Sequence, residues 1–224
     1  VRIWSQIAAH FKDEPAIAAY DLLNRPLNRV AGWQDKLDSL NKLYARTLKA
    51  IRGVEDNHVI IMQSAFSADY LPEFKIIPEN IAFGLYLHSH TSFETDALIA
   101  SVQSKKHLGI PFVISKIRAD DNIDYSLTAL CDNGISWLIG DYKGSGTRSA
   151  YLYSGEVEAI DFENNDFEAM TKKWKKPIAT KNFEQNKELA SILKNAFKYG
   201  IVYIEKDKNI IASTQRECVL NIFE

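Results

Sequence analysis

Short, nearly continuous apolar runs alternate with longer segments along the first two thirds of the chain. The apolar runs are residues 16–23, 58–63, 80–87, 111–115 and 134–140. Runs of this kind are typical of strands that are buried on both faces of a parallel sheet. The segments that separate them have about the length of helices, so the order of strand and helix predicts an α/β fold.

Two of the intervening segments carry clear helix signals. The first, residues 33–52, places five apolar side chains on one stripe: Leu37, Leu40, Tyr44, Leu48 and Ile51. The second, residues 96–109, ends on a basic turn followed by Gly109, which is a common helix stop. Both are predicted crossover helices. The alternation fits a closed barrel and an open doubly wound sheet equally well.

The pattern changes after Gly144. A loop rich in Gly and Ser is followed by helical patterns over residues 165–177 and 182–197, and then by a predicted hairpin over residues 200–213 that turns at Asp207–Asn209. We therefore divide the chain into residues 1–150, which hold the strand and helix units, and residues 151–224, which hold closing helices and a hairpin appendage.

Composition and charge exclude several classes of partner. The 224 residues carry 27 basic and 29 acidic side chains, a formal net charge of −2, so no overall field favours nucleic acid or an anionic membrane. The lysine-rich run at 172–177 is flanked by acidic segments and is interpreted as a solvated helix end. We predict neither a nucleic-acid partner nor a membrane partner.

Metal and cofactor motifs are also weak. Cys131 and Cys218 lack the spacing of a disulfide framework or a zinc site, and no glycine-rich phosphate loop is found. His88 and His90 would point the same way on a strand, but two ligands do not make a metal site. No cofactor is predicted. The chain starts at Val1 within a helical pattern that lacks signal-peptide features, which indicates a piece of a longer protein.

Five stretches in order resemble the second half of a glycoside hydrolase family 5 barrel, of the cellulase and exo-glucanase type. They are WSQIAAHFKDEPAIAAYDLLNRP, LYARTLKAIRGVEDNHVIIMQ, NIAFGLYLHSH, GIPFVISKIRA and GISWLIGDYKG, and they span roughly residues 1 to 145. The resemblance implies a (β/α)8 TIM barrel of which this chain holds strands four to eight. Strands one to three would have to come from sequence before Val1. It also implies a secreted or cell-surface protein.

The resemblance assigns a sugar site whose catalytic residues are changed. In the family, glutamates at the ends of strands four and seven act as acid/base and nucleophile, and the matching positions here are Arg25 and Lys116. The family's His and Tyr on strand six fall on Tyr86 and His88, and Asn24 is retained. The strand-eight tryptophan falls on Gly140, or on Trp137 after a short shift. The implied substrate-binding set is Asn24, Arg25, Tyr86, His88, Lys116 and Trp137.

Arginine and lysine cannot replace the two glutamates. A retaining glycosidase needs a carboxylic acid and a carboxylate about 5–5.5 Å apart. A guanidinium keeps its proton and has no lone pair for a carbon centre, and cations oppose a positive transition state. At about 5.5 Å, two such cations repel by about 3 kcal/mol at an effective dielectric of about 20. We expect Arg25 and Lys116 to splay apart or to share an anion, with Asp120, Asp121 and Glu94 as candidate partners.

These residues predict a catalytically inactive glycosidase-like protein that acts by binding or scaffolding, with carbohydrate as the inherited ligand. Several alternatives remain. Arg25 and Lys116 could form a pocket for an acidic sugar, Lys116 could form a Schiff base, relocated carboxylates could sustain hydrolysis of β-glucans, or the domain could be purely structural. Trp33 and Trp137 fit either sugar stacking or ordinary packing.

Overall fold

The fold was obtained as a computed structural model. It describes residues 1–28, 30–55, 57–87, 89–118, 123–144, 149–197, 203–204 and 210–211. The helices are α1 (Arg2–Phe11), α2 (Leu37–Arg52), α3 (Ser92–Ser104), α4 (Ile123–Asp132), α5 (Phe167–Ile178) and α6 (Lys187–Phe197). The main strands are β1 (Ala19–Asp21), β2 (Val59–Gln63), β3 (Ile81–Tyr86), β4 (Phe112–Arg118) and β5 (Ser136–Gly140). No helix in these ranges is long and apolar enough to span a membrane.

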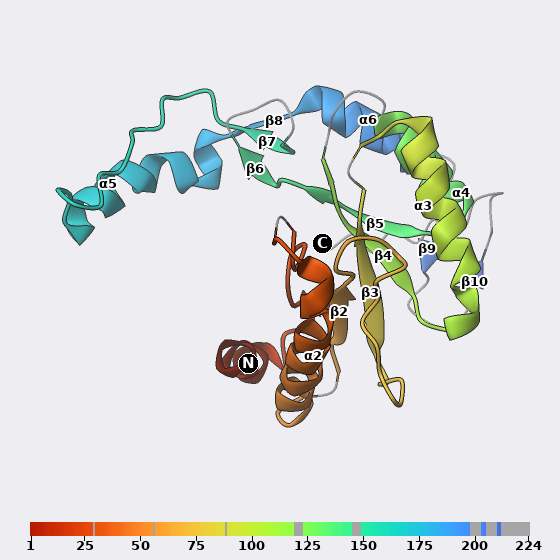
Figure 1. The fold of residues 1–224 in the computed structure, drawn as a ribbon. Coiled ribbons are helices and arrows are strands. Elements are labelled where there is room, and N and C mark those ends of the chain that lie inside the picture. Colours follow the sequence, from red (N-terminus) through yellow and green to blue (C-terminus); the bar gives the residue numbers. More distant parts are fainter. Residues whose placement is uncertain are drawn as a thin grey trace.

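The five strands form one parallel sheet in the order β1-β2-β3-β4-β5. Each strand therefore lies beside its neighbour in sequence, as in a barrel, whereas a doubly wound sheet reverses its order at a switch point. The sheet also curls, so that β5 runs across the direction of β2 and β3 in Figure 1. The predicted α/β fold is confirmed as half of a TIM barrel, and the doubly wound alternative is excluded.

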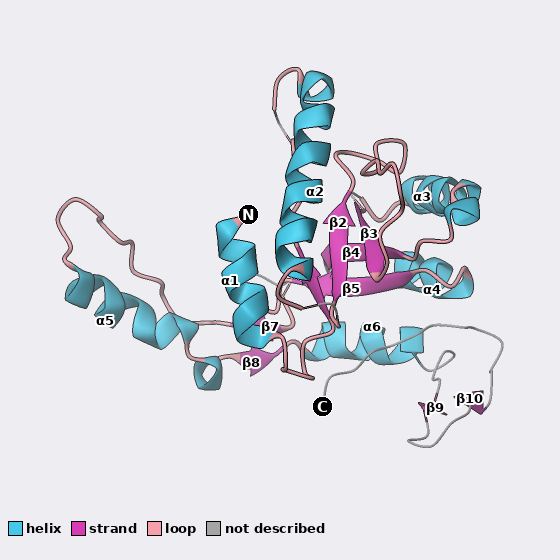
Figure 2. Cartoon of the chain, turned by 90° about the horizontal axis from the view of Figure 1, so that it is seen from below, coloured by secondary structure: helices cyan, strands magenta, loops and turns pink. Residues whose placement is uncertain are grey.

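Side-chain alternation in β3 separates the two faces of the sheet. Phe83 and Leu85 face the helices, whereas Gly84 and Tyr86 face the interior of the curled sheet. We call the packing of α1 and α2 on β1 to β3 the first core and the packing of α3, α4 and α6 on β3 to β5 the second core. Figure 2 shows these helices outside the curl of the sheet.

One of the helix-length segments between strands forms no helix. Residues 64–80 link β2 to β3 without forming a helix, contrary to the expectation that helix-length segments separate the strands. Pro72 and Pro78 bracket the second half of this link, and proline interrupts helical hydrogen bonding. Ile76 and Ile77 are 85% and 50% exposed as a result.

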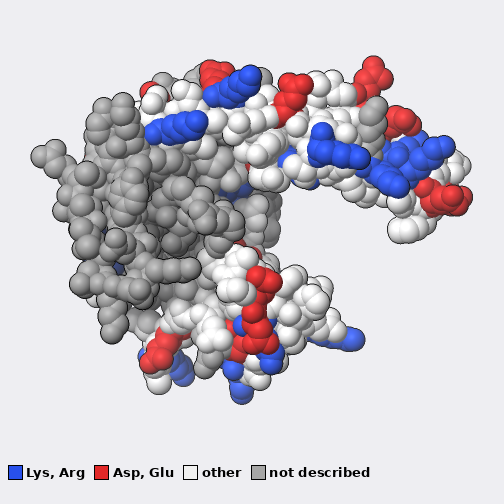
Figure 3. Space-filling view, turned by 180° about the vertical axis from the view of Figure 1, so that it is seen from behind, with Lys and Arg blue, Asp and Glu red and all other residues white. Residues whose placement is uncertain are grey.

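The residues after 144 form a small sheet and a projecting arm. Strands β6 (Lys143–Gly144), β7 (Tyr151–Leu152) and β8 (Glu184–Gln185) pair in that order. Helix α5 extends away from the body, and a wide hollow separates this arm from the part formed by α1 and α2 (Figures 1 and 3). Helix α6 returns to the body and buries Leu189 and Ala196 in the second core. Both helices predicted after Gly144 are present, but the second begins at Lys187 and not at residue 182, because Glu184 and Gln185 belong to β8.

The predicted hairpin near the end of the chain is also present. Strands β9 (Tyr203–Ile204) and β10 (Ile210–Ile211) pair antiparallel, with Ile204 opposite Ile210. The turn predicted at Asp207–Asn209 lies outside the described residues.

We expect residues 1–224, expressed alone, to self-associate. The described part of the sheet ends at β1 on one side and β5 on the other, and an unpaired strand edge is a template for pairing with another chain. Eight strands close a barrel of this kind, whereas this sheet holds five. Light scattering coupled to gel filtration tests the expectation. A monodisperse monomer that melts cooperatively would contradict the need for three further strands.

Candidate functional site

Arg25 lies at the carboxyl edge of the sheet, in the turn that follows β1. Its backbone has φ +50°, which is uncommon for any residue except glycine, and Leu27 is also left-handed at φ +65°. The Arg25 backbone N–H donates to Gln63 Oε1 at 2.8 Å, which ties the turn to the end of β2. Asn24, beside it, is exposed.

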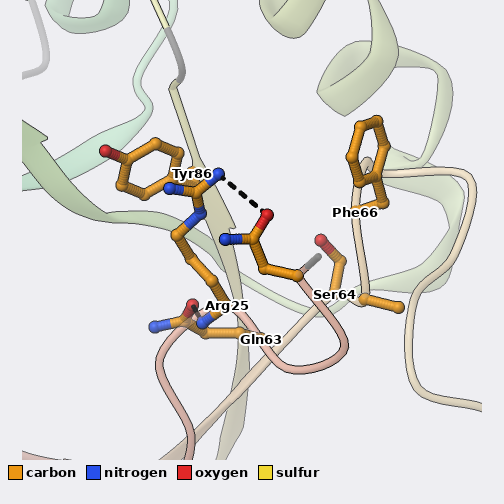
Figure 4. Close-up of a pocket in the computed structure, with 7 residues that line it drawn as sticks. Arg25, Gln63, Ser64, Phe66 and Tyr86 are labelled. Carbon is orange, nitrogen blue, oxygen red and sulfur yellow. Dashed lines mark hydrogen bonds between the residues drawn. The ribbon is translucent and has the colours of Figure 1, made fainter. Parts of the chain in front are cut away.

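The Arg25 side chain turns inward and stacks on Tyr86. Its guanidinium carbon lies 4.1 Å from the centroid of the Tyr86 ring, within the range of a cation–π contact. One guanidinium nitrogen, Nη2, donates to Asn28 Oδ1 at 3.3 Å (Figure 4). Tyr86 and Asn28 therefore hold the cation at the carboxyl edge of the curled sheet, which we call the mouth of the half-barrel.

Lys116 lies in β4 beside Tyr86, its register partner in β3. Its Nζ donates to Asp141 Oδ1 at 2.5 Å, an ion pair that is partly exposed. A Cβ added at Gly140 would lie 2.9 Å from both Cγ and Cε of Lys116. The lysine stem therefore occupies space that any larger residue at position 140 would need.

The partners expected for these cations need correction. Lys116 pairs with Asp141 instead of Glu94, which lies in the first turn of α3, and Asp120 and Asp121 are outside the described residues. Tyr86 lies between the two cations, stacked against Arg25 and paired in register with Lys116. Each cation thus has its own partners.

Trp137 and Gly140, the two candidates for the strand-eight tryptophan position, lie on opposite faces of the sheet. Trp137 faces the second core and donates its indole N–H to Cys131 Sγ at 3.4 Å, whereas Gly140 faces the interior beside Lys116. Strand alternation therefore places Gly140, and not Trp137, on the inner face.

His88 lies outside the described residues, and no cluster of three metal-ligating side chains occurs in the described ranges.

Trp33 belongs to an aromatic group beside the mouth. Its ring stacks on Phe66 with centroids 5.7 Å apart and meets Tyr70 edge-on at 4.6 Å. Phe66 is 52% exposed and lines the same hollow as Arg25 and Tyr86. The structure thus adds Phe66 and Tyr70, which sequence patterns did not single out, to the residues near the site.

A buried polar network beneath the mouth was also missed. The amide of Gln63 donates to Asp21 Oδ2 at 2.7 Å, and the Tyr44 hydroxyl donates to the Gln63 carbonyl at 2.9 Å. Gly84 makes room, because a Cβ there would lie 2.7 Å from Gln63 Cγ. The sequence signal was available: Asp21 and Gln63 end two otherwise apolar strands.

Two groups of the network, Asp21 and Tyr44, have raised pKa values. Burial raises the pKa of Asp21 to about 6, although hydrogen bonds from Gln63 and Ser115 act in the opposite direction. Burial, and then the charge of Asp21, raise the pKa of the Tyr44 hydroxyl above its usual value. Asp21 Oδ1 has no hydrogen-bond partner in the described part of the chain.

The mouth itself offers donors and aromatic faces. Figure 4 shows its labelled side chains around one small hollow, which is lined by Arg25, Asn28, Gln63, Ser64, Ala65, Phe66 and Tyr86. None of these described lining residues is a carboxylate. The hollow can donate hydrogen bonds and stack against a ring, but its lining holds no group that could act as a carboxylate nucleophile.

Comparison with known proteins agrees with this architecture. The sequence matches the model of the family described as Cellulase (glycosyl hydrolase family 5) over residues 1–195. No curated protein matches. Endo-glycoceramidase II from Rhodococcus sp., solved as a lactosyl-enzyme intermediate, is 20% identical with a TM-score of 0.55, and the match covers 69% of this chain and 41% of that one.

A second solved relative gives the same result. Thermotoga maritima Cel5A in complex with cellobiose is 18% identical with a TM-score of 0.52, and the match covers 66% of this chain and 59% of that one. The chain thus spans about half the length of these solved relatives. Similarity at this level shows a shared fold, and the family match over residues 1–195 shows that the chain belongs to glycosyl hydrolase family 5.

Proposed function

We propose that this chain is a non-catalytic member of its family and that the mouth of its barrel binds carbohydrate. The observation that carries the proposal is the arrangement of Lys116, Asp141 and Gly140. A cation stands at the position that the family resemblance gives to a catalytic carboxylate, and its charge is already paired. Arg25, at the other such position, is held by Tyr86 and Asn28.

The chemistry of hydrolysis argues against activity at this site. Both family roles need a carboxyl group next to the sugar, one to give a proton and one to attack the anomeric carbon. A guanidinium cannot serve as the general acid, and the Lys116 ammonium donates to Asp141. A positive transition state would also meet the guanidinium of Arg25 at the mouth.

Relocated carboxylates receive less support. Asp21 has the raised pKa of a candidate general acid. Gln63, and not Asp21, lines the hollow, and its amide donates to Asp21 Oδ2. Asp141 is engaged by Lys116 at 2.5 Å. Neither carboxylate lines the hollow at the mouth, so a sugar placed there would not reach two free carboxyl groups.

Carbohydrate remains the favoured ligand class because the mouth has the groups that recognise it. Phe66 offers an exposed ring, and Asn28 and Ser64 offer polar atoms beside it. The solved relatives include a lactosyl-enzyme intermediate, a ganglioside GM3 complex and a cellobiose complex. Arg25 lines the hollow and Lys116 does not, so the guanidinium of Arg25 is placed to donate to an acidic sugar there.

Calorimetric titration of the full-length protein with neutral and uronic-acid oligosaccharides tests this proposal. We expect Phe66→Ala to weaken binding of both about tenfold, or 1.4 kcal/mol, because it removes the stacking face. Arg25→Gln should remove only the preference for the acidic sugar, as should high salt. Lys42→Gln is the matched control, because the Lys42 side chain is exposed on α2 and does not line the hollow.

Two outcomes would overturn the proposal. Sugar binding that is unchanged by Phe66→Ala would place the ligand elsewhere on the protein. Failure of the full-length protein to bind any sugar of the panel would favour the purely structural alternative.

A further inference from the structure

The arm that carries α5 is inserted at the edge of the sheet where the mouth lies. Strand β6 begins three residues after Gly140, the last residue of β5, and α6 begins two residues after β8. An extended chain rises by about 3.3–3.6 Å per residue, so Lys143 lies within about 11 Å of Gly140. The arm thus starts beside the Lys116–Asp141 pair.

Lys143 fixes the arm onto this edge. Its Nζ donates to the carbonyl of Ile178, the last residue of α5, at 2.7 Å and to Thr180 Oγ1 at 3.2 Å. The same ammonium lies 5.3 Å from the centroid of the Phe183 ring. A cation at a helix carboxyl end satisfies free carbonyls and complements the helix dipole. The charge of Lys143 is therefore used within the arm.

An open apolar groove runs between the arm and its small sheet. We call it the arm groove, and its lining residues are Lys143, Gly144, Tyr153, Val157, Trp174, Pro177, Ile178 and Phe183. Trp174, Val157 and Ile178 are 46%, 55% and 61% exposed. Tyr153 and Phe183 pack together at 5.3 Å and form one side. Large apolar side chains gathered on an open surface indicate a binding site.

The charged side chains of the arm line an adjoining hollow, which shares Tyr153 and Pro177 with the arm groove. Lys172 and Lys173 line it together with Glu156 and Glu158, and Lys173 donates to the carbonyl of Ala159. Figure 3 shows basic side chains gathered along the arm with acidic side chains around them. No carboxylate lines the arm groove within the described residues. These features fit an uncharged apolar ligand better than a charged partner.

We infer that the arm groove holds the alkyl or acyl chain of an amphiphilic glycoside whose sugar lies at the mouth. The inference rests on the proposed carbohydrate binding. The first groove residues, Lys143 and Gly144, follow Gly140 at the edge of the sheet where the mouth lies. The groove begins at that edge and offers apolar surface and a tryptophan face, so one ligand can use both regions.

The test compares three probes by calorimetry on the full-length protein: octyl β-glucoside below its micelle concentration, methyl β-glucoside and octanol. Each buried methylene contributes about fourfold in affinity, so we expect octyl β-glucoside to bind at least about 50-fold more tightly than methyl β-glucoside. Val157→Asp and Trp174→Ala should remove this advantage and leave methyl β-glucoside binding unchanged. Phe162→Ser is the matched control, because Phe162 is 74% exposed on the same arm but outside the groove lining.

Failure of the inference and failure of the sugar site give different results. Equal affinity for the octyl and methyl glucosides, or an octyl advantage that survives both groove variants, would overturn the inference while sugar binding stands. Octanol that binds as tightly as octyl β-glucoside would also overturn it, because the groove would not be coupled to a sugar. A change of oligomeric state in Val157→Asp would instead identify the groove as an interface between copies. Phe66→Ala tests the mouth separately and should weaken both glucosides without affecting octanol.

Discussion

No β-glucoside should be hydrolysed above background by this protein, and the Arg25→Glu, Lys116→Glu double variant should recover little. Enzymes accelerate such reactions by at least about 10⁶-fold, so the expected loss is very large. The reason for poor recovery lies next to position 116. A glutamate there would face Asp141, whose carboxylate now lies 2.5 Å from the lysine Nζ.

Two carboxylates at that place would oppose each other. At about 4 Å and an effective dielectric of about 20 their repulsion is about 4 kcal/mol before screening by solvent. The pair would share a proton, which raises the pKa of one member and removes the free nucleophile. The triple variant with Asp141→Asn should therefore recover more activity than the double variant. Gln replacements at positions 25 and 116 are the matched controls, since they remove the cations without adding carboxyl groups.

The measurement is release of the aryl group from a panel of aryl β-glycosides by full-length protein purified by two independent routes. Turnover by the unmodified protein that persists through both routes would contradict the inactive site and promote relocated carboxylates. In that case Asp21→Asn would show whether Asp21 is one of them. A double variant as active as the triple variant would contradict the role given to Asp141.

Asp21→Asn should stabilise the protein at neutral pH. Burial raises the pKa of Asp21 from 3.8 to about 6, so the folded protein holds a proton there more firmly than the unfolded chain does. Stability from this proton is complete below about pH 4 and is lost as the pH rises through about 6. The shift corresponds to about 3 kcal/mol at most, and partial exposure of the residue reduces the expected gain to about 1–2 kcal/mol.

The substitution keeps the hydrogen bonds of the network. An asparagine carbonyl can accept from Gln63 as Asp21 Oδ2 does, and the Ser115 hydroxyl can accept from the new amide. Thermal unfolding between pH 4 and pH 8 is the measurement, and the difference between variant and wild type should grow with pH. Asp38→Asn, whose side chain is 77% exposed, should show no such trend. A variant that is less stable at every pH would contradict a buried, costly carboxylate.

The sequence predicted the sheet because its signal is local. Each of the five apolar runs overlaps one strand of the sheet, and the order of the motifs matched the order of a barrel. The link at 64–80 has the length of a helix, but length does not reveal that its prolines prevent one. Length was therefore a weaker guide there than residue type.

The site was only partly predictable because its contacts cross the sheet. Motif spacing placed Arg25 and Lys116 at the mouth, but the pairing of Lys116 with Asp141 depends on the neighbouring strand and on the space at Gly140. The ambiguity between Trp137 and Gly140 arose because β5 is apolar on both faces, which hides its alternation. Asp21 and Gln63 each end an apolar strand, but the sequence does not show that the two side chains meet or that Gly84 of β3 makes room for Gln63.

The close approach of Lys116 to Gly140 constrains the order in which substitutions can accumulate. In this conformation the lysine stem excludes even a methyl group at position 140, since the added carbon would lie 2.9 Å from two of its atoms. A large aromatic residue at 140 excludes this conformation of the lysine, which therefore requires the glycine. Replacing Gly140 alone would displace the Lys116 stem and disturb its ion pair with Asp141. We therefore expect positions 116, 140 and 141 to tolerate joint changes better than single ones.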